Sequence, residues 1–383
     1  MNAIVSFSEK LREWKMVTQK APARGERVLL TGAFGGVGEW AIQELLQLGY
    51  EVTCFDVPTS ANRKKAKKLG RRHAFSSVWG DLTDPQCVQS TMQSVRPNVV
   101  VHGAAIIPPL TIQRPELAYK VNVEGTRNLV AAAQDLGNQQ SGAPRRFVLV
   151  SSYSILGPSN PHTDPAPWNS ETPVNPQDDY GRQKLEAETI VQQCGLEWTI
   201  VRLCAVFPLA STSASADTFR FSFLLPYDRR EQAIDVRDAA LAIANATTAD
   251  PAACRTFVVG GGEGWQGIGG DFANAMMQNL GIPPIDRNAY RQADPAIDTS
   301  WYYENWVDTR ESERVLTYQR SSFPSFLADC RKAAGPARFA LPLLGPFIRS
   351  WILKKSPFAG TGPTVDSRPF AEAARDHMTR PKG

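Results

Sequence analysis

The chain has 383 residues, 42% of them hydrophobic, and a formal net charge of +4 at pH 7. This length accommodates one large α/β domain with additions, or two domains, and the small net charge gives no argument for nucleic-acid binding. Six scattered cysteines without a CxxC pair fit a reducing, cytoplasmic environment, and four scattered histidines without metal-ligand spacing predict no metal site. Residues 1–25 form an N-terminal extension that lacks the pattern of a signal peptide.

Residues 27–56 carry the strongest pattern in the chain. An apolar run over 28–30 enters a glycine-rich turn and continues as an amphipathic helix that ends near Gly49; a second apolar run then ends at Asp56. This order is typical of a dinucleotide site, in which the helix N-terminus receives the diphosphate and the acid binds the ribose. A flexible loop is the alternative explanation of the glycines, but the flanking patterns favour the nucleotide site. The cofactor contacts predicted here are Gly32, Phe34, Gly35, Gly36, Val37, Gly38 and Asp56.

The charges near Asp56 bear on which coenzyme binds. Its carboxylate accepts hydrogen bonds from a ribose but repels the 2′-phosphate of NADP, so it favours NAD. A basic run at residues 63–72 follows. We interpret this run as the solvated face of a helix. The alternative is that the run pairs with the 2′-phosphate, which would support NADP. NAD is therefore the expected cofactor, with NADP as the alternative.

Strand-like and helical patterns alternate from residue 26 to about residue 205. Apolar runs predict strands at 28–30, 52–55, 74–79, 99–101, 147–150 and 199–203, with helices between them, notably at 121–136 and 179–194. Such continuous apolar strands indicate an α/β fold with a doubly wound parallel sheet of the Rossmann type, which binds ligands beyond the carboxyl ends of its strands. We assign residues 26–205 to an NAD(P)-binding Rossmann domain to which residues 235–262 return, 206–335 to a smaller substrate-binding region, and 336–383 to an apolar, proline-rich C-terminal extension.

Further predicted cofactor contacts follow later strands of this sheet. Asp81, with Leu82 beside it, can reach the adenine amino group or cap the next helix. Ala104 and Ala105 are small enough to leave room for the ribose and nicotinamide. Asn122 opens a long helix, either as a cap or as a core amide. We count all five among the predicted cofactor-binding residues.

Three residues predict acid–base chemistry. Ser152 ends the fifth strand, and Tyr180 and Lys184, four residues apart, share one face of a helix. A lysine ammonium beside a phenol favours the phenolate and lowers the tyrosine pKa, which makes Tyr180 a candidate general acid or base near neutral pH. The Ser152 hydroxyl can hold a substrate oxygen, and Tyr180 and Lys184 are also predicted to contact the cofactor.

In order and spacing these motifs resemble the extended branch of the short-chain dehydrogenase/reductase superfamily, the epimerase/dehydratase-like group. The resemblance covers about residues 26–320. It implies Ser152, Tyr180 and Lys184 as catalytic residues, NAD as cofactor, and a homodimer formed through the helices that carry NVEGT and YGRQK. The motifs that carry it are TGAFGGVG at 31–38, Asp56, GDL at 80–82, VHGAA at 101–105, NVEGT at 122–126, VSSYSILG at 150–157, YGRQK at 180–184, DVRDAA at 235–240 and FVVGG at 257–261.

The chain departs from the family pattern around the expected substrate. Family 4,6-dehydratases carry an acidic pair after the strand-five hydroxyl, whereas residues 153–155 read Tyr-Ser-Ile, which argues against elimination of water. Sugar-nucleotide enzymes of the group show an R-x-x-N-x-Y-G-P run, whose Asn, Tyr and Gly are absent from residues 202–208. Arg229 and Arg230 remain as cations that could hold an anion, with surface charge as the alternative for one of them.

The favoured hypothesis is an NAD(P)-dependent oxidoreductase that transfers a hydride between the nicotinamide and a secondary alcohol or ketone, with Tyr180 as general acid or base. The missing sugar-nucleotide run and the apolar C-terminal region suggest a hydrophobic small-molecule substrate, as in 3β-hydroxysteroid dehydrogenase-like members of the superfamily. Two alternatives stay open. One is a sugar-nucleotide epimerase with tightly bound NAD, and the other is a non-catalytic dinucleotide-binding regulator.

Two aromatic segments lie in the predicted substrate-binding region. Phe219, Phe221 and Phe223 alternate within residues 211–225, which predicts a strand that lines an apolar pocket or packs as ordinary core. Residues 301–306 contain four aromatic side chains and are expected to pack across the substrate side.

The C-terminal extension holds an apolar segment at residues 337–355, which Pro342 and Pro346 interrupt and two lysines end. Such a segment could lie on a membrane surface, serve as a lid or form a dimer contact, and the membrane interpretation is not the favoured one. The tail after Lys355 is rich in proline and glycine, and we expect it to be ordered only if it docks on the rest of the protein.

Overall fold

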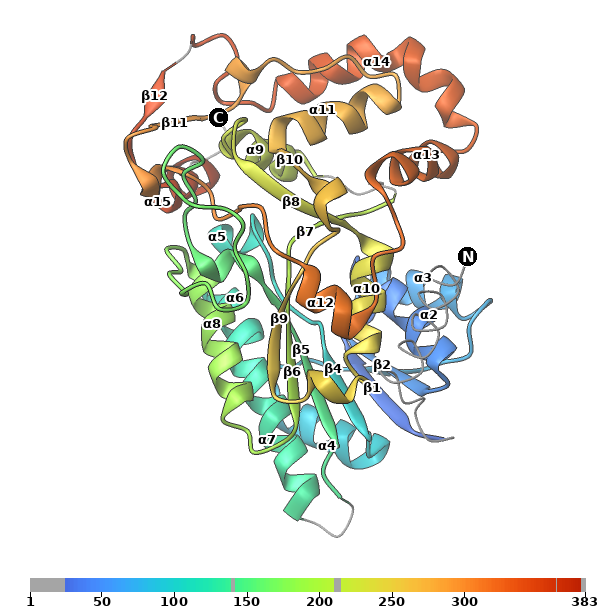
Figure 1. The fold of residues 1–383 in the computed structure, drawn as a ribbon. Coiled ribbons are helices and arrows are strands. Elements are labelled where there is room, and N and C mark those ends of the chain that lie inside the picture. Colours follow the sequence, from blue (N-terminus) through green and yellow to red (C-terminus); the bar gives the residue numbers. More distant parts are fainter. Residues whose placement is uncertain (1–24, 139–141, 210–214, 363, 380–383) are drawn as a thin grey trace, which may run out of the picture.

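The computed structural model describes residues 25–138, 142–209, 215–362 and 364–379, so nearly all of the predicted N-terminal extension lies outside the described residues. Its centre is a seven-stranded parallel sheet in the order β3-β2-β1-β4-β5-β6-β9 (Figure 1). The predicted Rossmann-type sheet is confirmed, and every strand expected before residue 205 belongs to it. The strands are β1 Arg27–Thr31, β2 Glu51–Asp56, β3 Ser76–Trp79, β4 Val99–His102, β5 Arg146–Ser152, β6 Trp198–Leu203 and β9 Arg255–Val259.

Helices cover both faces of this sheet, because side chains along each strand alternate between the two faces. Val28 and Leu30 of β1 belong to a core shared with α2 and α10, while Leu29 between them packs on the other face with α4, α7 and α8. The left-handed Gly49 ends α2 with φ 99°, as predicted. The helices of these layers are α2 Gly38–Leu48, α3 Ser60–Leu69, α4 Pro85–Val95, α7 Gly125–Asn138, α8 Asp179–Gln192 and α10 Val236–Asn245, and a π-helical turn, Lys120–Glu124, leads into α7.

A smaller layer stands beyond the carboxyl ends of the main strands, at the top of Figure 1. It contains the three-stranded sheet β10-β8-β7 and the short parallel pair of β11 and β12. The elements outside the main layers are α5 Leu110–Gln113, α6 Pro115–Tyr119, β7 Ala205–Phe207, α9 Ala216–Leu224, β8 Arg230–Asp235, β10 Gln266–Ile268, α11 Gly269–Asn279, β11 Gln292–Ala293, α12 Arg310–Leu316, α13 Phe323–Ala333, α14 Ala337–Leu353, β12 Val365–Asp366 and α15 Phe370–Thr379.

The prediction of a strand containing the three alternating phenylalanines is wrong, because these residues lie in helix α9. Ser215 caps the helix by accepting a hydrogen bond from the Thr218 N–H. Phe219 and Phe223, one helical turn apart, pack with one apolar cluster, while Phe221 faces another. Both sides of the helix are therefore covered, which produces an apolar pattern with the period of a strand. Residues 211–214 of the predicted segment lie outside the described residues.

The C-terminal extension docks on this smaller layer. Its apolar segment forms α14 as one uninterrupted helix through Pro342 and Pro346, so the expected interruption at the prolines is wrong. Packing stabilises the helix despite the lost hydrogen bonds, since Pro342 and Gly345 both lie against Gly281. The tail is ordered through α15, whose Phe370 is buried in a cluster with aromatic residues of the smaller layer.

Candidate active site

The glycine loop between β1 and α2 combines tight packing with an open backbone. A Cβ on Gly32, whose φ is +66°, would lie 2.7 Å from the Ala104 Cα, and one on Gly38 would lie 2.2 Å from the Gly32 carbonyl oxygen. A Cβ on Gly36, in contrast, would meet no atom within 4 Å. The loop backbone and the first N–H groups of α2 thus face free space, which fits a diphosphate group.

Asp56, at the end of β2, lies beside this loop. Its carboxylate accepts hydrogen bonds from the Phe34 N–H at 2.9 Å and from the Asn62 side chain at 3.0 Å. Burial raises the Asp56 pKa, and the backbone hydrogen bonds from Phe34 and Val57 oppose this shift. The acid is thus held at the edge of the glycine loop, where it can accept hydrogen bonds from a ribose.

The basic run forms α3, a helix in which no residue is buried. Lys65 donates to the Phe34 carbonyl oxygen and pairs with Glu39, and the Arg63 guanidinium lies 4.9 Å from the ring centroid of Trp79. These contacts agree with the interpretation of the run as a solvated helix face.

Of the predicted contacts after later strands, Ala105 lines a cavity of about 390 Å³ that the glycine loop also lines. Asp81 is exposed and accepts a hydrogen bond from the Thr83 N–H, while Asp84 caps α4. Asp81 is therefore not the helix cap, and its side chain stays accessible to a ligand. The neighbouring Leu82 is buried in the core, so its side chain supports the site without facing a ligand. Ala104 packs directly against Gly32 and supports the glycine loop in the same way.

Asn122 is a buried core amide, one of the two roles considered for it. Its side chain accepts from the Ile106 N–H at 2.7 Å, donates to the Ile106 carbonyl at 2.9 Å, and donates to Gln183 at 2.8 Å. It therefore fixes the loop after β4 against α8. This contact places it near the catalytic residues without making it part of the cavity wall.

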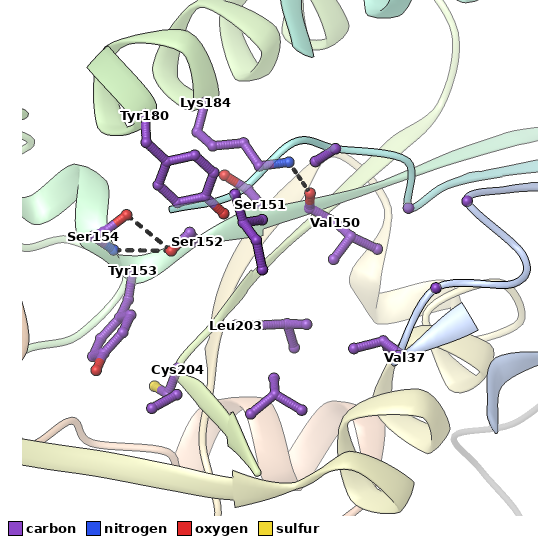
Figure 2. A pocket seen from close by; sticks show the side chains of 18 of the residues that line it. Val37, Val150, Ser151, Ser152, Tyr153, Ser154, Tyr180, Lys184, Leu203 and Cys204 are labelled. Carbon is purple, nitrogen blue, oxygen red and sulfur yellow. Dashed lines mark hydrogen bonds between the residues drawn. The ribbon is translucent and has the colours of Figure 1, made fainter. Parts of the chain in front are cut away.

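The structure brings the three predicted catalytic residues to one cavity of about 390 Å³ (Figure 2). Ser152 ends β5, while Tyr180 and Lys184 project from the first turns of α8. The Lys184 Nζ donates to the Val150 carbonyl oxygen at 2.7 Å, and the Ser152 Oγ lies 2.9 Å from the Ser154 Oγ. The glycine loop contributes to the same wall through Gly32, Gly35, Gly36, Val37 and Gly38.

The electrostatics of Tyr180 differ from the prediction. Burial raises its pKa above the ordinary value, the nearby Ser152 hydroxyl opposes this shift, and Asp178 adds to it. Burial lowers the pKa of Lys184 to about 8, although Glu188 acts in the opposite direction. The Lys184 ammonium donates to the Val150 carbonyl oxygen, and burial disfavours its charged form. The expected lowering of the Tyr180 pKa is therefore absent in this structure.

Other lining residues of the cavity lie outside the predicted set of catalytic and cofactor-binding residues. Phe221 of α9 and the segment Tyr302–Glu304 line the cavity, which agrees with the expected packing of residues 301–306 across the substrate side. Cys204, Tyr153 and Ser154 also line the cavity. The sequence signal that could have pointed to this part of the cavity wall is Glu304, the one acidic residue within the aromatic segment 301–306.

Glu304 belongs to a buried ionic group. The Arg229 Nε donates to it at 2.7 Å, and another nitrogen of the same guanidinium pairs with Glu231 at 2.5 Å. Burial raises the pKa of both acids, that of Glu231 to about 8, while Arg229 opposes the shift. Arg229 is thus committed to two carboxylates, and Arg230 binds backbone carbonyls of residues 161 and 164, so neither is an unpaired cation awaiting an anion.

Two further features complete the site. Ser151 Oγ is buried and lacks a hydrogen-bond partner within the described chain, and the buried Tyr153 hydroxyl lies close enough to the Glu304 carboxylate to oppose the rise of the Glu304 pKa that burial causes. Arg202, which begins the run where the sugar-nucleotide motif was expected, makes a buried two-pronged pair with Glu188. Across the residues that the structure describes, no three His, Cys, Asp or Glu side chains are grouped to hold a metal.

A glycine loop leading into a helix N-terminus, together with a serine, a tyrosine and a lysine on one cavity, defines a dinucleotide-binding site of the short-chain dehydrogenase/reductase class. Residues 28–217 match the model of the NAD dependent epimerase/dehydratase family. This part of the chain belongs to that family, which confirms the resemblance drawn from the motifs and agrees with NAD as the expected cofactor.

Similar proteins include both epimerases and a dehydrogenase. UDP-glucose 4-epimerase 2 of Oryza sativa subsp. japonica is 29% identical over 201 residues, which cover 49% of this chain and 46% of that protein. The 3-beta-hydroxysteroid dehydrogenase of Mycolicibacterium neoaurum is 35% identical over 136 residues, 34% of this chain and 33% of that protein. The chain spans about half the length of the curated relatives it matches first.

The same architecture occurs in solved structures. The dTDP-glucose 4,6-dehydratase DesIV from Streptomyces venezuelae, with NAD and TYD bound, has a TM-score of 0.66 and 21% sequence identity. The likeness covers 82% of this chain and 98% of that one. At this level of identity the comparison shows that the two proteins share a fold.

Proposed function

We propose that this protein is an NAD-dependent oxidoreductase acting on a secondary alcohol or ketone of a hydrophobic substrate. The observation that carries the proposal is the convergence of Ser152, Tyr180 and Lys184 with the glycine loop on one cavity. Family membership supports NAD as the cofactor, and the carboxylate of Asp56 favours it over NADP.

The roles of the residues follow from their positions. NAD supplies the donor or acceptor of a hydride when it is bound. The Ser152 hydroxyl donates a hydrogen bond to the substrate oxygen, and the Tyr180 Oη gives or takes the hydroxyl proton. Lys184, anchored on the Val150 carbonyl, holds the cofactor and favours the tyrosinate once a ligand moves its ammonium toward the phenol.

The chemistry of the cavity supports a hydrophobic substrate. Its far wall consists of Phe221, Tyr302 and Tyr303 together with the Glu304 carboxylate, which Arg229 already neutralises. Arg230 and Arg202 are occupied by protein partners as well. None of these three arginines is therefore free to bind the diphosphate of a sugar nucleotide.

A sugar-nucleotide epimerase is the second candidate, because UDP-glucose 4-epimerases stand among the relatives. It requires the same three catalytic residues and a tightly held cofactor. A non-catalytic regulator is a third interpretation, which the retention of Tyr180 and Lys184 disfavours. The homodimer through α7 and α8 stays a prediction.

Two measurements on the purified protein separate these functions. Mass spectrometry of released small molecules, with NADH and NADPH titrations, identifies the cofactor. Reversible NADH binding supports the oxidoreductase. Retained NAD together with turnover of UDP-sugars would refute the oxidoreductase and support the epimerase. We then expect Tyr180→Phe to reduce turnover of hydrophobic ketones by about 10²- to 10⁴-fold while NADH still binds. The exposed Tyr119→Phe is the matched control, and equal activity of wild type and Tyr180→Phe would contradict catalysis.

A further inference from the structure

Helix α14 presents an apolar face to solvent along its whole length. Phe339, Leu343, Phe347 and Trp351, spaced four residues apart, are 71%, 80%, 75% and 47% exposed, and Leu344 beside them is 51% exposed. Residues at this spacing form one stripe on a helix. Large apolar side chains this exposed, and grouped on one element, mark an interaction surface.

The opposite face of α14 packs closely on the rest of the protein, so the orientation of the helix, and with it the exposure of the apolar stripe, is fixed. A Cβ on Gly345 would lie 2.3 Å from the Gly281 carbonyl oxygen, which shows how closely the helix approaches its neighbour. Ile352 is buried and Ile348 packs beside it in the cluster around Phe223. Arg349 donates to the Pro284 carbonyl oxygen. The stripe is therefore held toward solvent in a fixed orientation. Helix α14 itself lies at the outer edge of the smaller layer (Figure 1).

The charge of the segment that carries the stripe has one sign, although Arg349 pairs with Asp286 of a neighbouring segment at 3.1 Å. No aspartate or glutamate occurs between Asp329 and Asp366, while this stretch contains six basic residues. At one end of α14 the Arg338 guanidinium lies 4.8 Å from the Phe339 ring centroid, and at the other the Lys355 ammonium lies 5.1 Å from that of Trp351. The six basic residues are Arg331, Lys332, Arg338, Arg349, Lys354 and Lys355.

We propose that α14 binds the surface of a lipid bilayer that contains anionic headgroups, with its apolar stripe in the interface and its cations at the headgroups. An apolar stripe with flanking cations, on a segment that itself contains no acid, is complementary to such a surface. A second copy of this chain is a poorer partner, because a two-fold contact would bring Arg338, Lys354 and Lys355 of both copies together, and α14 carries no acid to pair them. In the parts of the chain with described structure, no helix is long and apolar enough to cross a bilayer.

Helix α9 lies between the bound surface and the substrate cavity. Trp351 of α14 meets Phe219 of α9 edge to face, with ring centroids 5.6 Å apart. Phe221, two residues along α9, lines the cavity. Phe219 and Phe221 face opposite sides of α9, so this helix separates the bound surface from the cavity. Lipid binding itself rests on α14 alone and does not depend on the proposed function.

Vesicle cosedimentation of the full-length chain tests this proposal. We expect binding to phosphatidylcholine vesicles that contain phosphatidylserine at about 30%, and weaker binding to phosphatidylcholine alone or at high salt. The double variant Leu343→Ser/Phe347→Ser should lower partitioning by at least about tenfold. The double variant Leu117→Ser/Val174→Ser, whose apolar side chains are 43% and 41% exposed elsewhere, should bind like wild type.

Other outcomes would overturn the inference. Absence of binding to both kinds of vesicle, or equal loss in the two double variants, would exclude a specific lipid surface on α14. Sedimentation velocity completes the test, because a wild-type dimer that the Leu343→Ser/Phe347→Ser variant converts to monomers without a change in vesicle binding would make the stripe a subunit contact. Unchanged circular dichroism and melting of both variants would show that any loss of binding does not come from unfolding.

Discussion

Replacing Lys184 by methionine should stabilise the fold at neutral pH while it removes activity. Burial lowers the Lys184 pKa from 10.5 to about 8, and at about 1.4 kcal/mol per pKa unit the buried ammonium destabilises the folded state by about 3 kcal/mol. Loss of the hydrogen bond to the Val150 carbonyl opposes this gain by about 1 kcal/mol. We therefore expect Lys184→Met to raise the free energy of unfolding by about 2 kcal/mol at pH 7.

The gain should depend on pH with a definite sign. Below about pH 8 the lysine is protonated in the folded and unfolded states, so wild type carries the full penalty. Between about pH 8 and pH 10.5 the unfolded state binds more protons, wild type gains stability as the pH rises, and the advantage of the variant disappears.

Urea unfolding of cofactor-free protein at pH 7 and pH 10 measures this difference. Lys332→Met is the matched control, because Lys332 is exposed and its replacement removes no buried charge. A Lys184→Met protein that is destabilised equally at both pH values would refute the reasoning, since it would mean that the lysine contributes through packing and hydrogen bonding alone.

Three further tests address the glycine loop, the acid predicted to bind the ribose and the buried ion pair of Arg202. Gly36→Ala should leave thermal stability unchanged and weaken NADH binding at least about tenfold, because the new Cβ enters the free space expected to hold the diphosphate. Gly38→Ala should lower both thermal stability and NADH binding, because its Cβ meets backbone atoms. Equal melting temperatures for the two variants would contradict this reasoning. Asp56→Ser should raise the ratio of NADPH to NADH affinity at least about tenfold in a fluorescence titration, since a repelling charge is removed. Glu188→Gln should lower the free energy of unfolding by roughly 3 kcal/mol, because it leaves a buried arginine unpaired, while the exposed Glu186→Gln should change it by less than about 1 kcal/mol.

The cofactor half of the site could be predicted because its constraints are local. Gly32 and Gly38 are required by backbone contacts within one strand–turn–helix unit, and Asp56 ends the next strand of the same unit. The parallel sheet then brings Ser152 to the edge where this unit ends. Short-range patterns and one rule of sheet topology were therefore enough to gather residues that are distant in the sequence.

The substrate half could not be predicted in the same way, because it depends on long-range packing. The phenylalanines of α9 have the period of a strand only because two different clusters cover the two sides of one helix. Glu304 enters the cavity wall through its pairing with Arg229, 75 residues away. The Tyr180 pKa depends on burial by the assembled cavity, which a Tyr-xxx-Lys spacing does not report.

This division between the two halves explains why the family identifies the chemistry more sharply than the substrate. The family match ends at residue 217, so it contains the glycine loop and all three predicted catalytic residues. Phe221 and the Tyr302–Glu304 segment, which form the far wall of the cavity, lie beyond it. Behind them Phe370 of the C-terminal tail packs on Tyr302 and Tyr303, with ring centroids 4.7 and 5.5 Å apart. The far wall of the cavity is therefore built by segments outside the matched region, and the docked tail supports this wall.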